Sequence, residues 1–250
     1  MIFLEPEDSI PKKKRIPIGI YIFLFFLLCL LMFVISHIGK IFLAYQKQDA
    51  VYEDYKEQIV VSDTEKRQVS MDALKKVSPS SVSWIYIPGT RVDYPMVQGK
   101  DNFEFLKKDA YGNASDAGAI FLNSFNSPDM TDTKSIIFGH NMKNGSMFHD
   151  IRSYAKEKFA IEHPELYLYM QDGTARIYRF VCTFETTAQD DVVYTCNSTQ
   201  SSQEAIAPLL LKASSTYEQP NDMPFILLST CIKDDRRCIC LFQQTGAESK

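Results

Sequence analysis

The distribution of apolar residues divides the chain into three parts. Residues 16–35 are apolar almost without interruption, which is long enough to cross a bilayer as a helix. Residues 41–77 mix apolar with charged and amide side chains and contain no Gly or Pro, so we expect one or two helices there. From residue 81 onward the pattern changes to short apolar runs separated by turn signals, which is typical of strands.

Several of these short runs predict strands. They lie at 82–87, 92–97, 118–122, 134–139, 167–170 and 175–181. The last two form a hairpin, because Asp172-Gly173 between them is a strong turn signal. Many short strands with few helices indicate a closed or nearly closed β-barrel. One helix is predicted at 201–217, where a serine caps an apolar pattern of helical spacing and Pro208 marks a kink or restart.

The last two apolar runs, 225–231 and 237–242, predict an antiparallel hairpin with 232–236 as its loop. With that loop length Cys231 and Arg237 lie opposite each other, on one face, with Cβ atoms about 4.5–5.5 Å apart. A guanidinium beside a thiol favours the thiolate, which is the nucleophilic form. Arg236 would point to the other face.

Charge and cysteine content exclude several classes of function. The formal net charge of −4 gives no electrostatic support for binding nucleic acid. The six cysteines lack the regular spacing of zinc ligands or of a disulfide framework, so we expect most of them to be buried and no metal to be bound. Cys231 differs from the others, because a charged loop follows it almost immediately.

The apolar segment predicts a membrane anchor. Lysine and arginine concentrate at 12–15, before the segment, which places the N-terminus in the cytoplasm and the rest outside. A cleaved signal peptide is the alternative, but the apolar core is long for one and the residues after it are a poor cleavage site. We therefore predict a cytoplasmic head at 1–15, an anchor at 16–38, a helical stalk at 39–80 and a catalytic β-barrel at 81–245.

A cysteine nucleophile needs an acid or base, and His140 is the candidate. It follows Phe138-Gly139 at the end of a predicted strand, where β scaffolds present functional side chains. The other histidines lie at the membrane boundary or in polar segments. The alternative is that His140 is only a turn residue and has no catalytic role.

In its motifs the chain resembles the sortase family, and class B sortases in particular. The resemblance covers 81–242 and the apolar segment. It is carried by WIYIPGT (84–90), DYPMVQ (93–98), GAIFL (118–122), FGHNM (138–142), GSMF (145–148) and LSTC (228–231). The second and fifth of these point to class B. Leu227 departs from the pattern, since the family usually has Thr there.

The resemblance implies an eight-stranded sortase β-barrel with N-terminal helices and one helix before the catalytic strand. It also implies a membrane-anchored cysteine transpeptidase without a cofactor. Such an enzyme cleaves a secreted protein after the Thr of a C-terminal sorting motif and passes it to an amine of peptidoglycan or of a pilin. The resemblance assigns Cys231 as nucleophile, His140 as general acid and Arg237 as oxyanion or substrate stabiliser, and it places Asn102, Leu106 and Ser229 in the substrate groove.

Other interpretations remain open at this stage. Arg236 could replace Arg237, and Asp234 or Asp235 could supply a third catalytic carboxylate, although charged loop tips are usually only solvated. Another cell-wall cysteine hydrolase or transpeptidase is a second function, and a non-catalytic module that binds sorting motifs is a third. No acidic cluster supports a calcium site.

Overall fold

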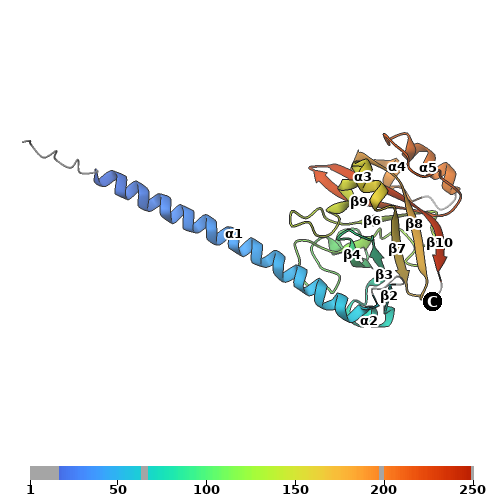
Figure 1. Cartoon of the computed structure of the whole chain (residues 1–250), viewed down its shortest axis with the longest axis horizontal. Helices are drawn as coiled ribbons and strands as arrows, with labels where there is room; N and C mark the ends of the chain where they lie inside the picture. Colours follow the sequence, from blue (N-terminus) through green and yellow to red (C-terminus); the bar gives the residue numbers. More distant parts are fainter. Residues whose placement is uncertain (1–16, 63–66, 197–199, 249–250) are drawn as a thin grey trace, which may run out of the picture. The chain divides into compact units, whose positions relative to one another are not determined.

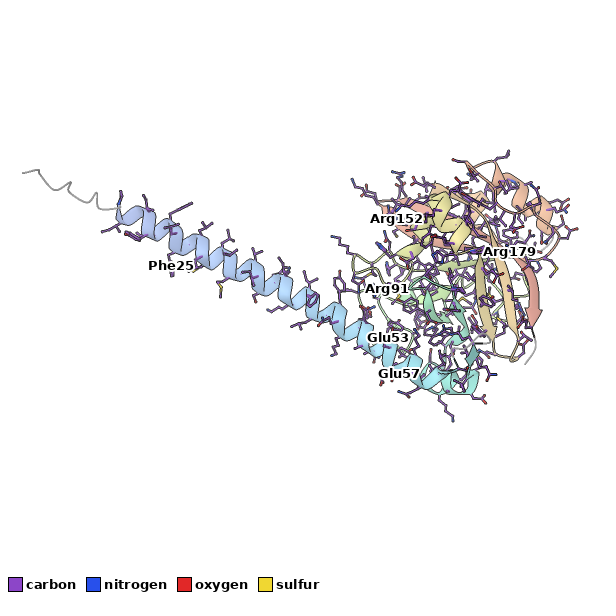
Figure 2. All side chains as sticks on the ribbon, viewed as in Figure 1. Phe25, Glu53, Glu57, Arg91, Arg152 and Arg179 are labelled. Atoms are coloured by element: carbon purple, nitrogen blue, oxygen red, sulfur yellow. The ribbon has the colours of Figure 1, made fainter. Side chains whose placement is uncertain are left out.

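The computed structural model describes residues 17–62, 67–196 and 200–248, and the predicted cytoplasmic head at 1–15 lies outside these ranges. The chain divides into two compact units, residues 1–47 and 48–250. In the first unit the described residues are helical, and large apolar side chains such as Phe25 project from the helix to the outside (Figure 2). This helix, α1 (Ile18–Ile59), is long and apolar enough to cross a membrane, with a mean hydropathy of 3.1 in its most apolar window.

The second unit is a barrel with short helices (Figure 1). Its strands are β1 (Val60–Ser62), β2 (Gln68–Val69), β3 (Ser81–Tyr86), β4 (Asp93–Gln98), β5 (Ile120–Leu122), β6 (Lys134–Phe138), β7 (Glu165–Met170), β8 (Ala175–Thr187), β9 (Phe225–Lys233) and β10 (Arg236–Glu248). Its helices after α1 are α2 (Met71–Val77), η1 (Glu104–Leu106), η2 (Asp150–Ala155), α3 (Glu157–Glu162), α4 (Asp191–Tyr194) and α5 (Ser202–Leu210).

Among the described residues, eight strands close into a barrel in the order β10-β8-β7-β3-β4-β5-β6-β9, and β1 and β2 form a small separate sheet. The predicted eight-stranded barrel is therefore confirmed. Most neighbours are antiparallel, whereas β4 pairs with β5 and β6 pairs with β9 in parallel. The strand pair β1–β2 was not predicted, and it separates α1 from α2 within the expected helical stalk.

β9 is buried along most of its length. Residues 225–230 are buried on both faces, because one face lines the barrel core and the other lies under α4 and α5. Figure 1 shows these two helices lying together, and their Val193, Ile206 and Leu209 pack with Leu227 of β9. A strand covered on both faces reads as a continuous apolar run, which is the pattern of this segment.

The predicted helix at 201–217 is correct at its start and wrong at its end. The side chain of Ser201 accepts a hydrogen bond from the Glu204 amide, and the Glu204 side chain accepts one from the Ser201 amide, which is a capping box. The helix ends at Leu210, two residues after Pro208. The chain beyond it pairs with β8 instead, since the Tyr217 amide donates to the Val181 carbonyl over 2.8 Å.

Asp93 anchors the C-terminal end of α1 to the barrel. Its carboxylate accepts from Lys56 of α1 at 2.7 Å, from Arg67 at 2.7 and 2.8 Å, and from the Trp84 indole at 2.8 Å. Burial lowers the pKa of Lys56, but the hydrogen bond to Asp93 together with the negative charges of Asp93 and Glu53 outweighs it, and the pKa is raised above its ordinary value. Beneath this cluster, Ile59, Leu74 and Trp84 form an apolar core.

We predict that Asp93→Ala lowers the free energy of unfolding by about 3 kcal/mol, because it removes one carboxylate that several largely buried donors share. Urea unfolding of the full chain in detergent micelles, followed by circular dichroism, measures the change. Asp116→Ala is the control, since the Asp116–Lys107 pair is exposed and should add nothing measurable. Equal unfolding midpoints for both variants would contradict the anchoring role.

Candidate active site

The parallel pairing of β6 with β9 places the ends of these strands side by side. The register runs from Lys134↔Phe225 to Phe138↔Ser229. Beyond the paired residues the Gly139 amide donates to the Ser229 carbonyl at 3.2 Å, and the buried Thr230 hydroxyl donates to the Gly139 carbonyl at 2.7 Å. These bonds bring the residues that follow, His140 and Cys231, to the same rim of the barrel.

Asn141 adds a further hydrogen bond between the two chain segments that follow β6 and β9. Its side-chain amide donates to the carbonyl oxygen of Cys231 at 3.1 Å, and its Oδ1 lies 3.0 Å from Nδ1 of His149. A second histidine therefore orients the asparagine that holds the backbone of Cys231.

The β9–β10 hairpin places Arg237 directly opposite Cys231, which confirms the predicted pairing. The predicted loop at 232–236 is wrong, because the strands continue to Lys233 and from Arg236, and the turn consists of Asp234 and Asp235. Lys233 pairs with Arg236, and the register then shifts, leaving Ile232 as a bulge. Without this register shift Arg237 would pair with Ile232 and face away from Cys231.

All six residues predicted for the site line one cavity of about 410 Å³. They are Asn102, Leu106, His140, Ser229, Cys231 and Arg237. Aromatic rings of Phe121, Phe125, Phe138 and Tyr194 form much of the remaining wall. The cavity is thus an apolar groove with a thiol, an imidazole and a guanidinium at its border.

The imidazole of His140 is held by the chain segment before β5. Its Nε2 lies 3.0 Å from the Leu106 carbonyl oxygen. Because a carbonyl oxygen can only accept, this contact places a proton on Nε2. Gly118 also passes close to the ring, where an added Cβ would lie 3.1 Å from Cδ2 of His140, the carbon bonded to Nε2.

The two neighbouring arginines have different partners. Arg237 donates from Nη1 to the carbonyl oxygens of Asp234 and Arg236, at 3.1 and 3.2 Å. Arg236 instead forms an ion pair with Glu185 of β8. Only Arg237 lines the cavity, and no carboxylate is among the described residues around it, so Asp234 and Asp235 lie outside the site.

Asn102 lines the cavity, but its amide is engaged within the protein. Its Nδ2 donates to Asn123 at 3.0 Å, and its Oδ1 accepts from the Ser124 amide at 2.8 Å. This pairing fixes the loop after β4 against the loop after β5. Asn102 therefore shapes the groove through these loops.

Sequence reasoning missed Tyr194, which lies in the unpredicted helix α4. Its hydroxyl is 3.0 Å from the Ser229 hydroxyl, and its ring stacks on Phe138 with centroids 6.1 Å apart. Burial raises the pKa of Tyr194, against the opposing effects of the Ser229 hydrogen bond and the Arg237 charge, so the phenol stays protonated at neutral pH. Asp190, whose side chain caps α4, was the signal that could have indicated this helix.

The six cysteines lie in the described part of the chain, and all are free thiols. Cys182, Cys238 and Cys240 are buried, whereas Cys29 is exposed and Cys196 and Cys231 are half-buried, so half of the six are buried where most were expected to be. Cys231 alone among the six lines the cavity. Within the described ranges, no group of three or more His, Cys, Asp and Glu side chains could hold a metal ion.

A closed barrel with a thiol, an imidazole and a guanidinium around one cavity at its rim has the arrangement of a cysteine enzyme, and comparison with known proteins identifies the family. The family model for the sortase domain matches residues 85–241, and the chain belongs to the sortase family. Its similarity within the family is to class B sortases. Sortase B of Listeria monocytogenes is 41% identical over 91 residues, which cover 36% of this chain and 37% of that protein.

Solved structures show the same fold. A Staphylococcus aureus sortase B–substrate complex superposes with a TM-score of 0.73 and 20% identity, covering 82% of this chain and 99% of that chain. A Streptococcus pyogenes class B sortase involved in pilus biogenesis gives a TM-score of 0.65 at 26% identity, covering 71% of this chain and 98% of that one.

We predict that Thr230→Val lowers the free energy of unfolding by about 1–2 kcal/mol, because the buried Gly139 carbonyl loses its donor next to His140. Urea unfolding measures this loss. Thr245→Val is the matched control, since its hydroxyl makes a longer bond, to Ile177, at an exposed position. If the two variants unfold at the same urea concentration, the Thr230 bond does not hold the site.

Proposed function

We propose that this chain is a membrane-anchored class B sortase that transfers a secreted protein from its sorting motif to an amine. The convergence of Cys231, His140 and Arg237 on one groove is the observation that carries the proposal. The matched segment spans only 37% of the Listeria relative, so the activity rests on this geometry together with the family.

The proposed reaction has two acyl-transfer steps. The Cys231 thiolate attacks the carbonyl carbon of the motif threonine, and the peptide C–N bond then breaks, leaving a thioester. His140 gives a proton to the departing amine. An acceptor amine next attacks the thioester, its proton passes to His140, and the Cys231 thiolate leaves.

In its imidazolium form, His140 would supply the proton that this reaction needs. Its Nε2–H points to the Leu106 carbonyl in the absence of substrate. We expect the leaving amine to take the place of that carbonyl when a peptide is bound, since catalytic hydrogen bonds often tighten only in the complex.

Arg237 is the proposed oxyanion stabiliser. Its guanidinium lies on the cavity side of the hairpin and now donates to exposed turn carbonyls, which water can satisfy in its place. It can therefore offer parallel donors to the developing oxyanion. Ser229 and Tyr194 face the same groove, and we place the peptide along them together with Leu106 and Asn102.

The N-terminal helix is the proposed anchor. Its most apolar window is entirely exposed, and a helix with so much apolar surface on every side requires lipid around it. The positive charges at 12–15 then set a cytoplasmic N-terminus and an extracellular barrel. We keep the division into head (1–15), anchor (16–38), stalk (39–80) and barrel (81–245) as part of this proposal, with a signal sequence as its alternative.

The substrate and acceptor are proposed by class. The substrates are secreted proteins with a C-terminal sorting motif cleaved between Thr and Gly or Asn, and the acceptor is an amine of peptidoglycan or of a pilin. Support comes from the family and from the structure of a relative described as a substrate complex.

Cys231→Ala should abolish acyl transfer and leave the fold intact. The test incubates the full chain in detergent with fluorescent peptides containing a Thr-Gly or Thr-Asn bond, and mass spectrometry detects the thioester adduct. Cys29→Ser, which removes an exposed thiol of α1, should still form the adduct.

The same experiment separates the alternatives. A wall hydrolase would ignore every peptide, and a binding module would retain peptide equally well with and without Cys231. Turnover by Cys231→Ala would exclude the proposed mechanism.

Arg237→Lys should lower kcat/KM by about 10²–10³, because one ammonium cannot supply the parallel donors of a guanidinium. Steady-state cleavage of the peptide that forms the adduct measures the loss. Arg236→Lys is the matched control, since its partner Glu185 lies on the exposed surface and its activity should change less than about threefold. The opposite ranking would show that Arg236 is the working arginine.

A further inference from the structure

Tyr52 connects α1 with the loop that holds His140. It precedes the residues 85–241 that the family model covers, and its side chain is 7% exposed. Its hydroxyl accepts from the Ala110 amide and donates to the Gly118 carbonyl, both at 3.4 Å. One side chain of α1 therefore bridges two points, eight residues apart, on the segment 106–118, which we call the histidine loop.

Both ends of the histidine loop lie beside the imidazole of His140. Leu106 supplies the carbonyl that accepts from Nε2. Gly118, with a φ of +58°, has its backbone so close that an added Cβ would lie 2.6 Å from the Phe105 oxygen and 3.1 Å from the imidazole. The residues that flank the loop are hydrogen-bonded to each other, since the Ala119 amide donates to the Phe105 carbonyl at 3.0 Å. A shift of either end therefore moves backbone that lies close to the ring.

Tyr52 also lies against the support of the His140 backbone. Its ring packs edge-on against Tyr94, with centroids 5.3 Å apart at 85°. The Tyr94 hydroxyl accepts from the Met147 amide at 3.1 Å, and the next amide, of Phe148, donates to the His140 carbonyl at 2.9 Å. The side chain and the backbone of His140 thus both have supports that touch Tyr52.

We infer that Tyr52 is a positioning residue for His140, acting through the Leu106 carbonyl and the Gly118 backbone. The hydroxyl is a permanent donor, because burial raises the pKa of Tyr52 far above neutrality. The C-terminal part of α1, which follows the proposed anchor, then helps to orient His140, the proposed general acid. The kinetic part of this inference rests on the proposed function.

The test compares Tyr52→Phe with Tyr55→Phe in the full chain in detergent micelles. Tyr52→Phe removes the two hydrogen bonds and keeps the ring. Tyr55 is the matched control, because its ring stacks on Tyr111 of the same loop with centroids 3.8 Å apart, and its substitution removes a hydroxyl of the same aromatic cluster. Both variants should unfold within a few degrees of the parent.

Two readouts are expected to separate positioning from simple stability. In spectra of histidine-labelled protein, with the His140 signals assigned through His140→Gln, Tyr52→Phe should shift those signals and leave the His163 signals in place. With the cleaved peptide, kcat should fall about tenfold while KM stays within about twofold, because a small misplacement of a catalytic group weakens the chemical step. Tyr55→Phe should change neither readout.

Unchanged His140 signals and unchanged kcat in Tyr52→Phe would overturn the inference, and so would equal losses in both variants. His140 signals that shift in a protein that cleaves no peptide would retain Tyr52 as a positioning residue and reject the proposed function. The magnetic resonance readout therefore distinguishes the two failures.

Discussion

The parallel pairing of β6 and β9 is the contact on which the site depends. These strands are 91 residues apart in the sequence, yet residue-by-residue pairing from Lys134↔Phe225 to Phe138↔Ser229 makes them end at the same rim. Neighbouring strands are about 4.8 Å apart, so residues that leave their ends together cannot be far from each other. The Thr230–Gly139 and Asn141–Cys231 hydrogen bonds extend this alignment to His140 and Cys231.

Burial keeps that pairing in register. β9 is covered by the barrel core on one face and by α4 and α5 on the other, so a slip by one residue would exchange the two apolar faces. The bulge at Ile232 then acts locally, turning Arg237 to the face of Cys231 while Arg236 pairs with Glu185. A rigid strand pair and one irregular residue together place a thiol, an imidazole and a guanidinium around one cavity.

The C-terminal end of α1 is built into the same unit. Asp93 holds Lys56, Arg67 and the Trp84 indole, and Tyr52 reaches the histidine loop. The helix is therefore more than a tether for the barrel, because its side chains satisfy buried polar groups and contact the supports of His140. This is why residues outside the matched domain bear on the proposed chemistry.

The sequence by itself determined the barrel strands, the capped start of α5 and the apolar segment of α1, because these follow from local periodicity and turn chemistry. It also predicted the pairing of Cys231 with Arg237, but from a five-residue loop, whereas the structure reaches that pairing through a two-residue turn and a bulge at Ile232. Only the tertiary structure decided the length of the β9–β10 turn, the early end of α5, and the places of Tyr52 and Tyr194. Each of these depends on a partner distant in the chain: the bulge on barrel pairing, the end of α5 on β8, and the two tyrosines on loops that fold around them. Local patterns carry no information about such partners, and the closed barrel supplies it by bringing them together.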